Sequence, residues 1–245
     1  MVLRSSSAGG AGARRFPPDL DPSGMADPPS LQCRAMKPDQ ARRFLARRGN
    51  PGEAWVAHSF QVAKVADRLG RALLQQQPDL DLDLDRVYVQ ALLHDVGRSV
   101  AHSPLHGWTG FVLLRARGES DAGRGCLAHW LKGRNRREMV ATSDLSQGFV
   151  DRVFQSWQPD RWTLTDSLVS VADSSVANTT IVPLAQRHAD LYRRYGDSRW
   201  LRRAEELALE HSQEIGQHLG RPVDSLLAPL YGQNLSLWPD SQSSA

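Results

Sequence analysis

The stretch at residues 53–77 places the strongest constraint on the fold. Its inward-facing residues recur at steps of four, three, four and four, the spacing of one helix face: His58, Val62, Val65, Leu69 and Leu73. A helix with such a stripe has to bury it against other elements. The stripe begins with His58, a polar residue on an apolar face. With this helix alone, the simplest interpretation is a buried histidine hydrogen-bonded to a backbone carbonyl.

Helical periodicity continues along the chain, and no segment makes a convincing strand. Asp and Leu alternate at 79–85 with the period of a strand, yet Pro78 and the repeated Asp favour a loop and a helix N-cap. No internal repeat of roughly 20 to 50 residues is present. We therefore predict an all-α fold with helices at 37–48, 53–77, 84–96, 104–117, around 126–130, 148–157, 163–176, 183–195 and 199–219.

The composition is that of a globular protein. Of 245 residues, 40% are hydrophobic and 23% are charged, and no window approaches the roughly 20 uninterrupted apolar residues of a membrane span. Lys and Arg outnumber Asp and Glu by only 30 to 27, so we expect neither a membrane nor a nucleic-acid partner. The two cysteines, Cys33 and Cys126, lie far apart without metal-site spacing, which favours the reducing cytoplasm.

The same composition suggests how the chain is divided. Residues 1–35 are rich in Ser, Gly, Ala, Pro and Arg without the apolar core of a secretory signal, so we expect a disordered leader. The helical patterns fill 36–220, which we interpret as one domain. Residues 221–245 are expected to form a loosely ordered tail. Nothing in the sequence indicates an oligomeric state.

An apolar run at 87–93 delivers His94 and Asp95 side by side and stops at Gly97, where helices commonly end. Burying two ionisable groups against Leu and Val is costly unless something binds them. A divalent metal would compensate, because imidazole and carboxylate together suit Mn, Fe, Co, Ni or Zn. Taken alone, however, such a pair is more often a helix cap or a hydrogen-bonded core histidine.

The helix expected at 163–176 adds Asp173 to a largely apolar face, although an exposed flank would explain this aspartate too. His211 and His218 also share a helix face, but no acidic or sulfur-bearing residue lies at metal spacing on it. We interpret these two as surface or core histidines. Potential ligands therefore come from three separate helices: His58, then His94 and Asp95, then Asp173.

This combination resembles the metal-dependent HD-domain phosphohydrolase superfamily, whose signature is a lone His, a His-Asp pair and a late Asp in a helical bundle. Residues 91–98, ALLHDVGR, resemble its LLHDIG element with a following basic residue. Residues 106–118, which begin with His-Gly and end with Gly, resemble a second segment of the family. Residues 167–173, SLVSVAD, resemble its IVxxAD helix.

The resemblance spans 37–219 and implies an HD-domain helical bundle with additional C-terminal helices. Residues 193–196, RRYG, followed by the helix that carries Glu205 and Glu206, resemble a small prokaryotic branch with a stand-alone HD domain. After His129 the sequence lacks the acidic and GYP-type signatures of cyclic-dinucleotide phosphodiesterases. A cyclic dinucleotide is therefore disfavoured as a substrate.

By position, the resemblance implies that one divalent transition metal is held by four residues: His58, His94, Asp95 and Asp173. In several branches two later histidines hold a second metal, with the aspartate of the His-Asp pair as a bridge. His106 and His129 occupy the matching places, and His102 is a less favoured substitute. The chain departs from a His-rich family element at 128–133, so one metal and two metals both stay open.

The resemblance also implies hydrolysis of a phosphate ester, with a nucleotide or a related small phosphorylated molecule as substrate, by metal-activated water. Asp95 would orient the metal-activated water or bridge the two metals. Arg98 would neutralise the phosphate or, alternatively, cap the carbonyls of the preceding helix. The basic run at 132–137 is of a kind that usually marks a solvated helix end, but beside a site it would bind the phosphate: Lys132, Arg134, Arg136 and Arg137.

Two other functional classes stay open for a chain with these residues. Some HD-domain proteins are di-iron oxygenases, which would require His106 and His129 as metal ligands. Others would keep the fold and a metal but only sense a nucleotide, without turnover. Because every expected ligand is present, the non-catalytic module is the least favoured of the three.

Overall fold

The computed structural model describes residues 35–50, 52–157 and 162–235, so positions 1–34 of the expected leader lie outside the described residues. Within those ranges the chain forms eleven α-helices, which confirms the all-α prediction. In chain order the elements are α1 (Pro38–Arg48), α2 (Ala54–Gln76), α3 (Leu84–Leu93), η3 (Val96–Ser99), α4 (His106–Arg115), α5 (Ser120–Leu131), α6 (Arg136–Thr142), α7 (Gln147–Trp157), α8 (Leu164–Ser174), β1 (Val176–Ala177), β2 (Thr180–Ile181), α9 (Leu184–Tyr195), α10 (Arg199–Leu219), α11 (Val223–Leu227) and η5 (Ala228–Leu230).

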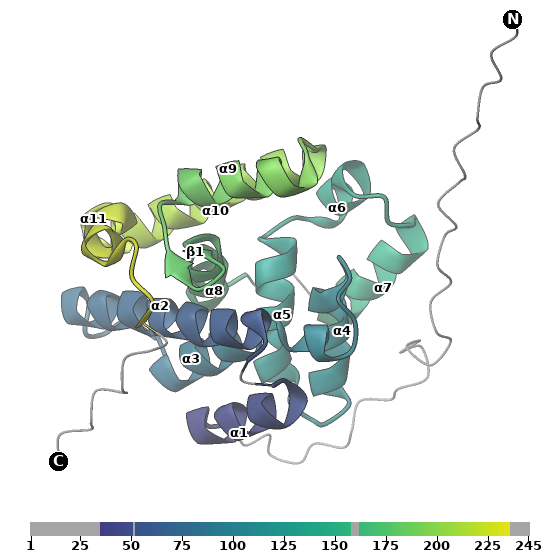
Figure 1. Cartoon of the computed structure of the whole chain (residues 1–245), viewed down its shortest axis with the longest axis horizontal. Coiled ribbons are helices and arrows are strands. Elements are labelled where there is room, and N and C mark those ends of the chain that lie inside the picture. Colours follow the sequence, from purple (N-terminus) through teal and green to yellow (C-terminus); the bar gives the residue numbers. More distant parts are fainter. Residues whose placement is uncertain (1–34, 51, 158–161, 236–245) are drawn as a thin grey trace, which may run out of the picture.

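Helices α2, α3, α5 and α8 pack against one another and form the centre of the molecule (Figure 1). The stripe predicted for α2 is confirmed, since Val62, Val65, Leu69 and Leu73 are all fully buried. Helix α3 buries every residue from Val87 to Leu93. The remaining helices surround this centre: α1 packs on α3, α4 on α5 and η3, and α9 and α10 on α8.

Helices α3 and α5 come unusually close at Gly125. A Cβ atom at this position would lie 2.2 Å from the carbonyl oxygen of Gln90, so only glycine fits. The close approach brings His129, one turn further along α5, beside the end of α3.

The start of α8 is fixed to α5 by a buried carboxylate. Thr163 and Asp166 form a capping box, in which each side chain accepts a hydrogen bond from the backbone N–H of the other residue. Arg124 of α5 donates two hydrogen bonds of 2.7 Å to Asp166. Because the cap sets the rotation of α8 about its axis, it also sets where Asp173 points two turns later.

Three features of the secondary structure differ from the sequence expectation. Helix α3 ends at Leu93 rather than near 96, and a separate 3-10 turn, η3, follows His94 and Asp95. Helix α6 lies between the helices expected around 126–130 and at 148–157, where we expected none; it begins with a capping box between Asn135 and Glu138. Strands β1 and β2 form a two-residue antiparallel ladder that the sequence did not suggest.

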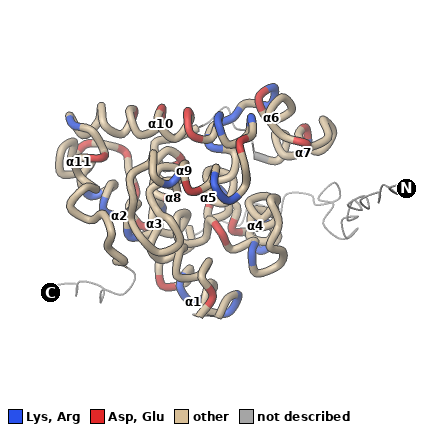
Figure 2. The backbone as a smooth tube through the Cα atoms, turned by 45° about the horizontal axis from the view of Figure 1, so that its top comes forward, with Lys and Arg blue, Asp and Glu red and all other residues tan. Residues whose placement is uncertain are grey.

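The expected loosely ordered tail at 221–245 needs correction where it is described. Residues 223–230 form α11 and η5, with Val223, Leu227 and Leu230 buried against the core, because these apolar residues recur at helical spacing. Residues 236–245 lie outside the described residues. Among the helices described, none has the length and apolarity to cross a membrane. Figure 2 shows acidic and basic residues interspersed over these elements.

Candidate metal centre

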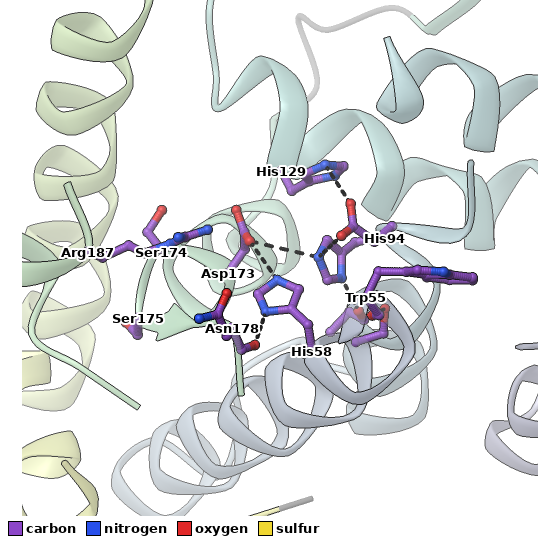
Figure 3. Close-up of polar contacts among 12 residues, drawn as sticks. Trp55, His58, His94, His129, Asp173, Ser174, Ser175, Asn178 and Arg187 are labelled. Carbon is purple, nitrogen blue, oxygen red and sulfur yellow. Dashed lines mark hydrogen bonds and ion pairs between the residues drawn. The ribbon is translucent and has the colours of Figure 1, made fainter. Parts of the chain in front are cut away.

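A first group of ligand atoms joins α2, the end of α3 and α8 (Figure 3). His58 donates from Nδ1 to the carbonyl oxygen of Asn178 at 2.7 Å, and its Nε2 lies 3.2 Å from Asp173 Oδ1. His94 donates from Nδ1 to the Ala91 carbonyl at 2.7 Å, and its Nε2 lies 3.8 Å from the same Asp173 oxygen. Carbonyl oxygens only accept hydrogen bonds, so both rings carry their proton on Nδ1 and turn Nε2 towards Asp173.

A second group adjoins the first and is centred on Asp95. His106 donates from Nδ1 to the Ser103 carbonyl at 2.7 Å, while the His129 Nδ1 lies 3.4 Å from the Gly125 carbonyl. Their Nε2 atoms lie 3.0 and 3.6 Å from Asp95 Oδ1 and 3.0 Å from each other. This group therefore repeats the arrangement of the first, with the backbone holding the outer nitrogen of each ring.

The ligand atoms in each group lie within 4.8 Å of one another, and their chemistry fits a cation. His94 is fully buried, and its Nε2 has no hydrogen-bond partner among the described residues. With the proton on Nδ1, the lone pair of that nitrogen points towards the oxygens of two carboxylates, Asp95 at 3.9 Å and Asp173 at 3.8 Å. Lone pairs converging in a buried space are unfavourable unless a positive ion lies between them. The donor set, imidazole with carboxylate, suits a divalent transition metal.

The protonation states expected for the acidic ligands also suit a metal. Burial alone would raise the pKa of Asp95, but His94 and His106 outweigh it and hold that pKa well below its usual range. Burial acts in the same direction on Asp173, and Lys132 and His58 overcome it there. Both carboxylates are therefore ionised at neutral pH.

The two most buried imidazoles of the two ligand groups, His94 and His129, are correspondingly neutral. Burial lowers the pKa of His94, although Asp95 and Asp173 oppose the shift. Burial also lowers the pKa of His129 well below its usual range, with the nearby His94 acting in the same direction. Neutral imidazole and ionised carboxylate are the forms that bind metals.

Asp95 lies between the two groups and also contacts Arg98. Its Oδ1 faces His106 and His129, while its Oδ2 accepts a hydrogen bond of 2.7 Å from Arg98 Nε. The rings of His94 and His129 meet edge to face with centroids 4.8 Å apart. The two ligand groups therefore adjoin each other, with Asp95 between them.

A tight contact explains why a second histidine reaches Asp95. Gly97 of η3 packs on the first turn of α4, where a Cβ would lie 2.0 Å from the carbonyl oxygen of His106. The 3-10 turn and α4 can therefore approach closely enough to bring the imidazole of His106 against the carboxylate.

Of the four basic residues predicted to bind substrate, Lys132 lies at the cluster. It follows α5 in the left-handed conformation, φ 51°, and its buried ammonium donates to Asp173 Oδ2 at 3.2 Å. The same ammonium donates to Ser174 Oγ at 2.8 Å and to the Ser170 carbonyl at 3.4 Å. Burial lowers the pKa of Lys132, and the charge of Asp173 opposes that shift.

The other three basic residues lie elsewhere. Arg134 is buried under Trp200 and donates to the backbone carbonyls of Leu131 and Trp200, so its guanidinium serves packing. Arg136 forms an ion pair with Asp151, with half of its side chain exposed. Arg137 is exposed on α6. The basic run therefore divides into residues with different surroundings rather than forming one phosphate-binding loop.

The sequence analysis missed Asn178, whose carbonyl orients His58. Asn178 has φ 55° in the two-residue turn between β1 and β2, a conformation that Asn adopts more readily than most residues. Asn178, preceded by Val-Ala and followed by Thr-Thr-Ile, was a readable turn signal. The contact with His58 uses the backbone carbonyl of Asn178, so the residue type at this position does not predict it.

Comparison with protein families agrees with this geometry. The family model described as HD domain matches residues 55–178, just over half of the chain. The chain belongs to the HD-domain family. The matched segment begins three residues before His58 and ends at Asn178, and it includes all six candidate ligands. Neither the curated proteins nor the solved structures gave a match.

Membership in the HD-domain family confirms the resemblance drawn from the sequence. Proteins of this family are mostly metal-dependent phosphohydrolases, and the described residues include two His and Asp groups that could hold a metal. The assignment of individual ligands, and the resemblance to a stand-alone prokaryotic branch, stay predictions.

Proposed function

We propose that this protein is a metal-dependent hydrolase of a phosphate ester in a small molecule, with a nucleotide as the preferred candidate. The observation that carries the proposal is the convergence of two ligand groups at Asp95, with the buried His94 Nε2 facing carboxylates. We assign His58, His94, Asp95 and Asp173 to one divalent metal. His106 and His129, with Asp95 as a bridge, are assigned to a second.

The charge of the centre favours an anionic substrate. Two carboxylates, Asp95 and Asp173, face the cationic side chains of Arg98 and Lys132. A bound dication therefore gives the centre a net positive charge, which attracts a phosphate group. The cytoplasm remains the location that we predict from cysteine usage.

When bound, a divalent metal would polarise a phosphoryl oxygen and lower the pKa of a coordinated water. The protein's own groups would do the rest. Arg98 is held by Asp95 through Nε, and its Nη2 lies 3.4 Å from His106 Nε2. About a third of its side chain is exposed, so its other N–H groups could reach a phosphoryl oxygen. The four rings keep Nε2 directed inward because their Nδ1 atoms face backbone carbonyls.

Metal analysis and a substrate panel test the proposal. We expect the purified protein to contain a transition metal and to hydrolyse a member of a panel of nucleoside monophosphates, cyclic nucleotides and generic phosphate esters. The double variant His94→Ala with Asp95→Ala should lose both metal and activity. His102→Ala is the matched control, because His102 is an exposed histidine of the neighbouring turn, and it should keep both. Unaltered metal content in the double variant would reject the proposal.

The second ligand group also supports a different activity. His106 and His129 lie at Asp95 Oδ1, as a di-iron oxygenase requires. Two irons per chain with oxygen-dependent turnover, and no phosphate release, would favour that alternative. Stabilisation by a nucleotide without any turnover would instead indicate a sensor.

A further inference from the structure

The last described stretch of the chain, residues 232–235, is bonded to β2. The Gly232 N–H donates to the Ile181 carbonyl at 2.9 Å, and the Ile181 N–H donates to the Gln233 carbonyl at 3.1 Å. Figure 1 shows the chain running from α11 towards α2 as this stretch ends. Both backbone polar groups of Ile181 are thus bonded to residues 232–235, which we call the C-terminal segment.

Helix α2 holds the C-terminal segment from the other side. Gln61 is fully buried, and its Nε2 donates to the Gln233 carbonyl at 3.3 Å. Three residues later, Lys64 Nζ donates to the Leu235 carbonyl at 2.8 Å, and the Leu235 side chain is buried in the core. A carbonyl oxygen has two lone pairs, so the Gln233 oxygen accepts from β2 and from α2 at once. This one oxygen atom links the two elements.

The same two elements carry both partners of the hydrogen bond that orients a candidate metal ligand. His58 lies three residues before Gln61 on α2. Asn178 lies three residues before Ile181, in the turn between β1 and β2. The contact of 2.7 Å between His58 Nδ1 and the Asn178 carbonyl therefore depends on how α2 and this turn lie relative to each other. The C-terminal segment fixes that relation.

The turn between β1 and β2 needs such support. The two strands pair over two residues each, and a two-stranded hairpin by itself is only marginally stable in water. From α9, Arg194 Nη2 reaches Asn178 Oδ1 at 3.5 Å, which is a long contact with the side chain. The C-terminal segment bonds at shorter distances to the backbone of β2. It is therefore the firmer of these two supports.

We propose that the C-terminal segment is a positioning element of the metal centre. By joining α2 to β2 through the Gln233 carbonyl, it keeps the Asn178 carbonyl on His58 Nδ1 and leaves His58 Nε2 directed at Asp173. The match to the HD-domain model ends at Asn178, so this support comes from a part of the chain that the match does not include. The inference rests on the proposed assignment of His58 to a metal.

Titration of the full-length chain with Mn²⁺ tests the positioning role. Gln61→Met keeps the approximate size of the buried side chain but removes the donor to Gln233, so we expect the Mn²⁺ affinity to fall about tenfold. Gln77→Met is the matched control, because Gln77 at the other end of α2 also donates its amide to a backbone carbonyl, that of His218, at 2.8 Å. It should keep the wild-type affinity. Equal affinity in wild type and Gln61→Met, or an equal loss in Gln77→Met, would overturn the proposal.

A second variant acts from the side of β2. Gly232 has φ 80° and donates its N–H to Ile181, so Gly232→Pro removes both this conformation and the donor. Exchange of the His58 Nδ1 proton with solvent, followed by NMR in the metal-free chain, should be about tenfold faster in Gly232→Pro and in Gln61→Met than in wild type. A lower Tm with wild-type exchange and wild-type Mn²⁺ affinity would assign the segment to stability alone and reject the positioning role.

The two measurements distinguish this inference from the proposed function. If the wild type binds no metal but the His58 proton exchanges faster in both variants, the proposed function is rejected and the positioning of His58 stands. If the wild type binds metal and cleaves a phosphate ester while neither variant changes affinity or exchange, the positioning role is rejected and the hydrolase stands.

Discussion

Lys132 illustrates how one residue changes meaning once its surroundings are known. In the sequence it opens a basic run and suggests a phosphate contact. In the structure its ammonium is buried and bound to Asp173, Ser174 and a carbonyl, so under the proposed function it would act on a substrate only through Asp173. It is a positioning residue that holds a metal-ligand candidate in place.

Replacing Lys132 by Met should expose this role. Removing one partner of a buried ion pair leaves the other uncompensated, so the metal-free protein should lose about 3 kcal/mol of unfolding free energy. The loss should be smaller in the metal-loaded protein, because the metal compensates Asp173. Urea unfolding with and without chelator measures both values. Arg136→Met, which breaks the exposed pair with Asp151, should leave the unfolding free energy close to that of the wild type, because solvent screens an exposed ion pair. Equal losses in the two variants would contradict the positioning role.

Four of the six candidate ligands were predictable because each is a polar residue in an apolar context, whereas His106 and His129 were predicted from the family resemblance alone. His58 begins a buried stripe, His94 and Asp95 end a buried run, and Asp173 interrupts an apolar face. The buried His188 also stands at helical spacing between Leu184 and Leu191 on the amphipathic α9, a signal of the same kind that the sequence analysis did not use. The burial of Arg134 was not predictable from local pattern, because it lies under Trp200, which is 66 positions further along the chain.

At the scale of elements, glycines decide how closely helices approach. Gly125 lets α5 lie against Gln90 of α3, and His129 is one turn away on the same helix. The spacing of α3 and α5 therefore controls the distance between His129 and Asp95, which is 3.6 Å.

Gly125→Ala should separate these two helices. The added methyl meets backbone rather than a flexible side chain, so we expect a loss of about 1–3 kcal/mol in unfolding free energy and weaker metal binding. Chemical denaturation and metal titration measure the two effects. Gly148→Ala in α7 has open space around the new methyl and should change stability by no more than about 1 kcal/mol. Wild-type stability in Gly125→Ala would show that the helices are not held at this contact.

Helix positions were largely predictable, because amphipathic spacing alone identifies long helices such as α2 and α10. The short α6 was missed although its capping box was readable in the sequence. The end of α3 was placed too late because nothing local marks the change to a 3-10 turn; the contact of Gly97 with α4 explains it. Tertiary contacts thus decided the details that local pattern left open.

At the scale of the whole molecule, the candidate centre connects distant parts of the chain. Its residues come from α2, α4, α5 and α8 and from the segment between α3 and η3, and His58 and Asp173 are 115 positions apart. An ion bound there would cross-link the central helices in the folded state only.

Removal of metal should therefore lower stability as well as activity. Binding to the folded state alone contributes about 2.7 kcal/mol when the free metal is one hundred times its Kd. Differential scanning calorimetry with and without chelator should show a lower Tm for the wild type, and the difference should vanish in His94→Ala. An equal chelator effect in both proteins would place the stabilising ion elsewhere.

The four imidazoles share one further property, namely that the acceptor facing each Nδ1 is a backbone carbonyl, from Asn178, Ala91, Ser103 or Gly125. A side-chain acceptor can be deleted by a point mutation, but a carbonyl persists whatever residue occupies the position. At the partly exposed Ser103, where neither core packing nor a left-handed backbone restricts the residue type, we expect the residue to vary in evolution while the ring of His106 keeps its tautomer. The orientation of each ring is then set by the backbone conformation and not by the residue type at the acceptor position.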